Sequence, residues 1–141
     1  EAVTMADENN VEDRYMQFQQ LQQQLVQIAE FVERLRQQQQ EIETSLEALK
    51  ELKETRINTE ILAPIANGIF VKAELKDNAG LIVNIGADVA AEKTIPEVVV
   101  LLEEQKEKIA GNISEAESVL EQLYAQGVKI SQEVESGANR N

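Results

Sequence analysis

The feature that most constrains this chain is a seven-residue repeat of apolar side chains, which occurs once in each half of the sequence. In the first half, mostly apolar residues recur at alternate spacings of three and four, and no Gly or Pro lies between them. We call this row of positions the seam. These positions are Val11, Arg14, Phe18, Leu21, Leu25, Ile28, Val32, Leu35, Gln39, Ile42, Leu46 and Leu49. The pattern predicts a long helix that pairs with another helix in a coiled coil. Asn10 is its expected N-cap.

The second half of the chain repeats the pattern from Ile95 onward. Its seam positions are Ile95, Val99, Leu102, Lys106, Ile109, Ile113, Ala116, Leu120, Leu123, Gly127, Ile130 and Val134. Thr94 is followed three residues later by Glu97, which is the spacing of a capping box, and Pro96 falls in the first turn, where its missing N–H costs little. A second coiled-coil helix is therefore expected to begin near Ile95.

The two seams have nearly equal length, which favours antiparallel pairing of the two helices. Placing Leu49 opposite Ile95 brings the polar seam residues Gln39 and Lys106 to about the same level and puts Phe18 near Gly127. A slip of one helical turn in either direction stays open. We interpret the polar layer as a feature that fixes register, in preference to a buried functional site.

Between the seams the period of the apolar residues changes from that of a helix to that of strands. Four short apolar stretches, 61–65, 69–75, 81–85 and 89–92, are separated by turn residues at 66–68, 76–80 and 86–88. They predict two β hairpins, with Pro64 at a strand edge or first position. Isolated hairpins are marginal in water, so we expect these to pair with strands of other subunits.

Two sets of apolar side chains on single strand faces are the candidate assembly residues. They are Ile69, Val71, Ala73 and Leu75 in one hairpin and Leu81, Val83 and Ile85 in the other. The predicted fold class is α+β, a long antiparallel two-helix coiled coil with two β hairpins inserted between the helices. The predicted segments are a flexible N-terminus (1–8), a coiled-coil helix (9–58), a β-hairpin assembly insert (59–93), a coiled-coil helix (94–135) and a flexible tail (136–141).

Composition argues against several classes of function. The formal net charge of -13 opposes binding to nucleic acid or to anionic membranes. The chain has no Cys and no His, and none of its six Gly residues belongs to a phosphate-binding loop, so we expect no enzyme, cofactor, metal or ATP site. We read the Gln runs as a solvated helical face in preference to an aggregation tract. With no apolar run of membrane-spanning length and no signal-peptide pattern, the chain is expected in the cytoplasm. Met5 is a candidate translation start, so residues 1–4 are left out of the fold prediction.

The insert carries a family resemblance. Residues 62–75, LAPIANGIFVKAEL, resemble a segment of archaeal prefoldin alpha subunits, and VNIGADV at 83–89 is similar to the second hairpin of that family. Glu92, Lys93 and Thr94 resemble its entry to the C-terminal helix. Ala66 and Asp88 stand where the family often has Gly, and Asp accepts left-handed geometry more readily than Ala does.

The resemblance implies a hetero-hexamer of two alpha and four beta subunits, with the hairpins in a β-barrel platform from which the coiled coils extend. It also implies capture of unfolded client proteins at the coiled-coil ends, without ATP, and delivery to a group II chaperonin. The antiparallel count then places the candidate client-binding residues farthest from the insert. They are Val11, Tyr15, Phe18, Leu123, Ile130 and Val134. The alternative is that these side chains merely close the coiled coil.

Two functions remain open from the sequence. The first is an ATP-independent holdase, and the second is a structural or filament-forming relative of prefoldin whose arms act as spacers. A defined hexamer with a beta partner would support the first, and open-ended self-assembly would support the second.

Overall fold

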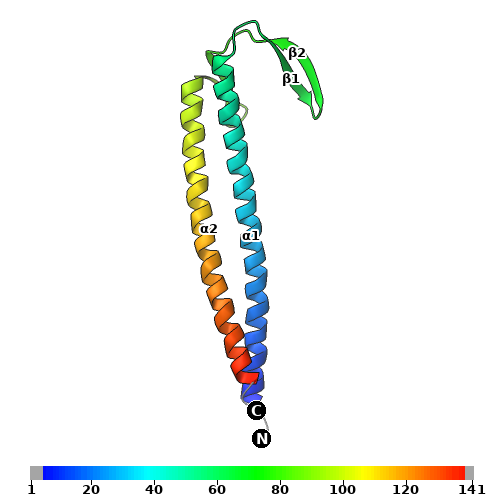
Figure 1. Ribbon diagram of the computed structural model, residues 1–141, viewed down its shortest axis with the longest axis vertical. Helices are drawn as coiled ribbons and strands as arrows, with labels where there is room; N and C mark the ends of the chain where they lie inside the picture. The colour runs from blue at the N-terminus through cyan, green and yellow to red at the C-terminus, as the bar shows by residue number, and fades with distance from the viewer. Residues whose placement is uncertain (1–4, 139–141) are drawn as a thin grey trace. The chain divides into compact units, whose positions relative to one another are not determined.

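A computed structural model describes residues 5–138 as two long helices with two β hairpins between them in the chain (Figure 1). The elements are α1 (Met5–Glu54), β1 (Glu60–Ala66), β2 (Ile69–Glu74), β3 (Gly80–Asn84), β4 (Ala90–Thr94) and α2 (Ile95–Ala138). The predicted order of a helix, two hairpins and a helix is confirmed.

Helix α1 begins at Met5, before the predicted boundary at residue 9, and Asn10 lies inside it. The prediction that Asn10 is the N-cap is therefore wrong. At the other end of the chain, α2 continues to Ala138. The remaining residues of the predicted flexible ends, 1–4 and 139–141, lie outside the described residues.

The C-terminus of α1 is closed by hydrogen bonds from residues that follow it in the chain. The Thr55 hydroxyl donates to the Glu51 carbonyl (2.6 Å). The Asn78 side-chain amide donates to the carbonyl oxygens of Leu52 (3.3 Å) and Thr55 (2.9 Å). The sequence pattern identified Asn78 only as a turn former. Because it satisfies carbonyl groups that a helix end leaves unpaired, Asn78 also ties the loop between the hairpins to α1.

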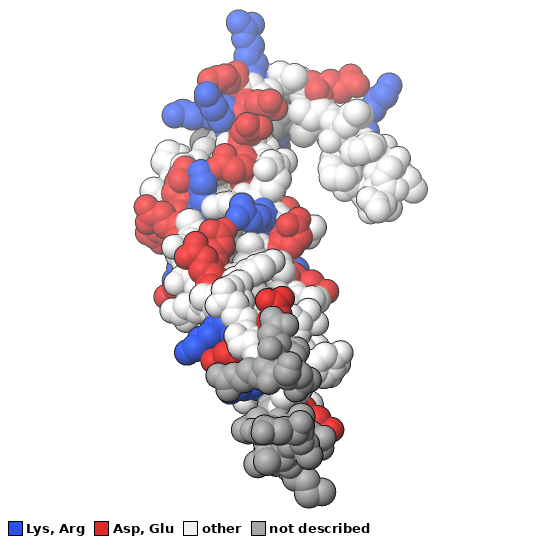
Figure 2. All heavy atoms as spheres, turned by 60° about the horizontal axis from the view of Figure 1, so that its bottom comes forward, with Lys and Arg blue, Asp and Glu red and all other residues white. Residues whose placement is uncertain are grey.

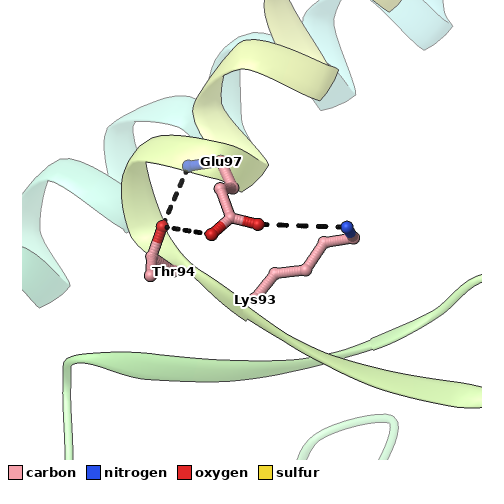
Figure 3. A network of polar contacts seen from close by, with 3 residues as sticks. All are labelled: Lys93, Thr94 and Glu97. Atoms are coloured by element: carbon pink, nitrogen blue, oxygen red, sulfur yellow. Dashed lines mark hydrogen bonds and ion pairs between the residues drawn. The ribbon is translucent and has the colours of Figure 1, made fainter.

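The start of α2 has the N-cap hydrogen bond of the capping box expected from the sequence (Figure 3). The Glu97 backbone N–H donates to the Thr94 hydroxyl (3.3 Å), and that hydroxyl donates to the Glu97 carboxylate (3.2 Å). The ammonium of Lys93 lies 4.0 Å from the same carboxylate. These contacts fix the point at which β4 turns into helix.

The paired helices bury their seams. All predicted seam positions except Val11 are buried or half-buried. The chain divides into two compact units, of which the first joins α1 up to Gln38 with α2 from Ile109, and the second comprises Gln39–Lys108. In the first unit, Val32 and Leu35 of α1 pack with Ile113 and Ala116 of α2 to form the core. In the second unit, Ile42, Leu75 and Ile95 are buried.

The helix register differs from the predicted one by about one turn. A Cβ atom added at Gly127 would lie 3.1 Å from Cδ2 of Leu21, so Gly127 faces Leu21, where the count from the sequence placed Phe18. In the second unit, Lys106 pairs with Glu43, one turn further along α1 than Gln39. Heptad seams slipped by one turn still match apolar positions, so the difference is decided by specific contacts such as these.

Each hairpin is a separate two-stranded antiparallel sheet. Strands β1 and β2 pair with Ile61 opposite Ala73 and Ala63 opposite Val71, and a bulge between Pro64 and Ala66 shifts the register. Pro64 is accommodated as predicted, because both strands of a two-stranded sheet are edges. Gly68 completes the β1–β2 turn with φ at 78°.

The turn between β3 and β4 uses left-handed backbone at two consecutive residues without glycine. In this turn, φ is 48° at Ala87 and 60° at Asp88. The turn is closed by hydrogen bonds between Val89 N–H and the Gly86 carbonyl and between Ile85 N–H and the Val89 carbonyl, both 2.9 Å. Ala66 has ordinary strand geometry, so its departure from the family Gly leaves the first turn intact.

Candidate functional site

The first candidate site is the β1–β2 hairpin. Residues directly opposite each other across the two strands share a face, so Val71 and Ala73 lie on one face with Ala63 and Ile61. Ile69 and Val71 are exposed and Ala73 is half-buried. In Figure 2 this hairpin is white over most of its surface, in contrast to the mixed charges on the helices. An exposed apolar face of this kind is typical of a protein interface.

The β3–β4 hairpin supplies the other predicted assembly residues. Leu81 and Val83 are half-buried and lie opposite Lys93 and Ala91, and Ile85 is exposed just beyond β3. Leu75 lies just beyond the end of β2 and is only 8% exposed, whereas the other predicted assembly residues are half-buried or exposed. Its backbone N–H donates to the Thr59 carbonyl (3.0 Å), so Leu75 belongs to the core of its own unit.

Sequence reasoning missed the opposite faces of the hairpins. Residues Leu62, Phe70 and Ile82 are exposed and apolar, with Ile82 at 75% exposure. Ile65, which is 69% exposed, lies at the bulge between Pro64 and Ala66. The signal was available, because Leu62, Pro64 and Phe70 alternate with the residues of the predicted face. The β1–β2 hairpin thus offers apolar side chains on both faces. A layer packed on one face would leave the other face exposed.

The second candidate site lies on the first compact unit, near the ends of the helices. Tyr15 and Met16 are exposed, Tyr15 at 59%, and together with Val11, Glu12 and Val134 they line a hollow of about 330 Å³. Arg14 of α1 and Glu133 of α2 form an ion pair of 3.6 Å in the same part of the unit. Three of the predicted client-binding residues, Val11, Tyr15 and Val134, are therefore brought together.

The other predicted client-binding residues lie elsewhere on the paired helices. Phe18 is half-buried and lines a separate hollow with Gly127. Leu123 and Ile130 are half-buried seam residues. Sequence reasoning did not single out the exposed side chains of Met16, Tyr124 and Val128, which fall between seam positions.

The described residues offer little for a metal ion or a membrane. Among the side chains that the structure describes, those of residues 11–136, there is no group of three or more His, Cys, Asp or Glu that could hold a metal. Over the same residues, neither helix is long and apolar enough to cross a membrane.

Comparison with known families agrees with the architecture. The family model described as "Prefoldin subunit" matches residues 13–140, which is most of the chain. The chain belongs to the prefoldin subunit family. The resemblance that the insert carries is thereby confirmed over both helices as well as the hairpins.

Several relatives of this prefoldin subunit are archaeal proteins named prefoldin subunit alpha. The protein from Methanoculleus marisnigri is 30% identical over 76 residues, which cover 54% of this chain and 51% of the relative. The protein from Methanosarcina acetivorans is 33% identical over 73 residues, covering 52% and 46%. The matched part spans about half the length of these relatives.

A solved structure has the same fold. It is a filamentous PFD from Methanocaldococcus jannaschii determined by cryo-EM, with a TM-score of 0.56 and 22% identity, and the match covers 87% of this chain and 96% of that chain. The likeness extends over helices and hairpins and supports the architecture of this prefoldin subunit.

Proposed function

We propose that this prefoldin subunit is part of an ATP-independent chaperone that holds unfolded proteins. In this proposal it assembles through its hairpins with beta-type subunits into a hexamer of two alpha and four beta chains. The helix ends bind unfolded clients, which then pass to a group II chaperonin. Family membership supports the chaperone role, and the alpha-subunit names of the relatives support the choice of partner.

The observation that carries client binding is the exposed hollow formed by Val11, Tyr15, Met16 and Val134. A folded chain that needed these side chains only to close its coiled coil would bury them. Instead Tyr15 and Met16 remain exposed. Several such arms in one assembly would give weak individual contacts that add up through multivalency, which suits clients of many sequences. The net charge of -13 would keep loaded arms apart.

Deletion of the helix ends tests client binding. Removal of residues 5–18 and 124–141 spares most heptads and both hairpins, so the shortened chain is expected to assemble but to lose suppression of aggregation of an unfolded test protein, with or without ATP. Because beta arms can hold clients alone, the deletion is compared in alpha only and in all subunits. Retained suppression after deletion of every arm end would contradict the proposed binding site.

Charged substitutions test assembly. Val71→Asp or Val83→Asp places a carboxylate on the predicted strand face and should give helical but unassembled chains. Asn84→Asp is a matched control, because it adds the same charge on β3 while its oxygen can still accept the Gly86 N–H that Asn84 now accepts (2.9 Å). An intact hexamer carrying Val71→Asp, measured by mass in solution, would contradict the role of this face.

The alternative is a filament-forming subunit, and the filamentous PFD from Methanocaldococcus jannaschii favours it as a second candidate. The β1–β2 hairpin has apolar side chains on both faces, which suits an interface that continues from chain to chain. A heterologous contact that does not close produces open filaments. Mass in solution with and without a co-expressed beta subunit separates the two: a fixed mass with the partner supports the hexamer, and growth with concentration in its absence supports the filament.

A further inference from the structure

Residues 15–29 of α1 contain no charged residue, although 28% of the chain is charged. This stretch reads YMQFQQLQQQLVQIA and contains seven glutamines, all of them exposed. Among the described residues, none of the seven side-chain amides is hydrogen-bonded to another residue. The predicted solvated face is therefore exposed. In this stretch its polar groups are side-chain amides, whereas other parts of the helix also carry charged side chains.

Two neighbouring hollows lie on this stretch, and both are uncharged. The first, of about 570 Å³, is on α1 alone and is lined by Gln19, Gln22, Gln23, Val26 and Gln27. The second, of about 420 Å³, lies between the helices of the first unit. Its lining residues are Phe18, Leu21, Gln22, Leu25, Tyr124, Gly127, Val128, Ser131 and Gln132. Gln22 belongs to both hollows, so a molecule that follows the surface can contact an amide row and an apolar groove together.

The space in the groove depends on the absence of a side chain at Gly127. A Cβ atom there would already stand 3.1 Å from Cδ2 of Leu21, so a larger residue would fill the gap between the helices. The exposed side chains of Tyr124 and Val128 also line this groove. The groove can thus accept an apolar side chain without any rearrangement of the seam.

The chemistry of the two hollows matches an extended polypeptide. Each residue of an unfolded chain presents one N–H donor and one C=O acceptor, and these groups are the same whatever the sequence. A glutamine amide both donates and accepts, so a row of such amides can bond the main chain in either direction. Alternate side chains of an extended segment point to opposite sides, so one set can enter the apolar groove while the other faces water.

We propose that the amide surface, defined as Gln19, Gln22, Gln23, Val26 and Gln27 with the adjoining groove, binds the main chain of an extended, uncharged segment of an unfolded protein. The uncharged lining of both hollows selects this occupant, because it gives a charged segment no counter-ion. The inference rests on the proposed chaperone function and adds a second means of contact, hydrogen bonding to the client backbone beside apolar contact at the helix ends.

The test uses the full chain and a fluorescent twelve-residue peptide of Leu, Ser, Thr and Gly without charge. The triple variant Gln19→Glu, Gln22→Glu, Gln23→Glu keeps side-chain size but removes the N–H donors and adds charge. The loss of two net hydrogen bonds should weaken peptide binding by at least about fivefold. The matched control is Gln37→Glu, Gln38→Glu, Gln40→Glu, which makes the same charge change on exposed positions of the same helix and should bind within about twofold of the parent.

A second peptide separates backbone recognition from side-chain recognition. N-methylation of alternate residues removes main-chain N–H donors and leaves the side chains unchanged. It should weaken binding to the parent, because the glutamine side-chain oxygens then lose the main-chain N–H donors from which they accept. Circular dichroism of each variant confirms that helix content is kept.

Three results would overturn the proposal. The first is binding of the peptide to the triple variant as tightly as to the control, and the second is failure of the parent to bind it. The third is loss of concentration-dependent self-association in the triple variant with peptide binding unchanged, which would make the occupant a second copy of this chain. If the amide variant retains client binding and the end deletion abolishes it, this inference fails and the proposed function stands.

Discussion

Replacement of two glycines inside α2 by alanine gives opposite tests of the helix packing. Gly111 and Gly127 both lie within Ile95–Ala138, where glycine is about 1 kcal/mol less favourable than alanine. A Cβ atom at Gly111 would meet no atom within 4 Å, so Gly111→Ala should gain the full increment. At Gly127 the new methyl group would contact Leu21 at 3.1 Å, and moving that side chain off its rotamer costs about 0.5 to 1.5 kcal/mol. Gly127→Ala should therefore be close to neutral.

Urea and thermal unfolding followed by far-UV circular dichroism measure both variants. An increment of 1 kcal/mol corresponds to roughly 3 to 5 °C in the melting temperature of a chain of this size. Mass in solution must be the same for parent and variants, because assembly adds to apparent stability. Equal stabilisation by the two substitutions would refute the contact between Gly127 and Leu21 and with it the helix register. Destabilisation by Gly111→Ala would mean that another surface covers this side of α2.

Three further predictions concern the second compact unit and the seam. Asn78→Asp should lower stability and weaken assembly, because a carboxylate cannot donate to the carbonyls of the α1 C-terminus and is repelled by the negative end of the helix dipole; unfolding and mass in solution check this. Ile42→Ala should cost about 2 kcal/mol or more and Ile109→Ala, which is only half-buried, somewhat less, while assembly persists; an unchanged melting temperature would misplace the seam. A hydrogen bond to Glu43 raises the pKa of Lys106 above its ordinary 10.5, against a smaller opposing effect of burial. The ion pair of Lys106 and Glu43 therefore stabilises the folded chain fully below pH 10.5, and this contribution is lost as pH rises through the raised pKa. The difference in urea midpoint between the parent and Lys106→Gln should accordingly shrink at strongly alkaline pH.

The sequence was sufficient for the secondary structure because each element has a strong local signal. The heptad positions, the Thr94 and Glu97 capping pair and the alternating strands all depend on neighbours within a few residues. The turn at Asn67 and Gly68 was likewise expected from local preference. Assignments of this kind agree with the structure because local preference and tertiary packing favour the same conformation.

The register and the cap on α1 could not be obtained in that way, because both depend on residues distant in the chain. A heptad seam looks almost the same after a slip of one turn, and the contact of Gly127 with Leu21 and the ion pair of Arg36 with Glu117 join residues in opposite halves of the chain. Asn78 caps a helix that ends more than twenty residues earlier. The burial of Leu75 has the same origin, since its backbone bonds to Asn58 and Thr59, which precede β1 and are distant in the chain.

The distribution of buried and exposed apolar side chains separates what the chain can stabilise alone from what requires a partner. The helices bury Val32, Leu35, Ile113 and Ala116 to below 10% exposure within one chain, so the arms have a core of their own. The hairpins are two-stranded and expose apolar side chains, on both faces in the case of β1–β2, and sheets of this size are marginal without a third strand or a packed layer. Loss of assembly should therefore leave the arms helical, which is the reason that Val71→Asp is expected to yield helical but unassembled chains. A subunit built in this way keeps its helical arms folded while its contacts with other subunits form or separate.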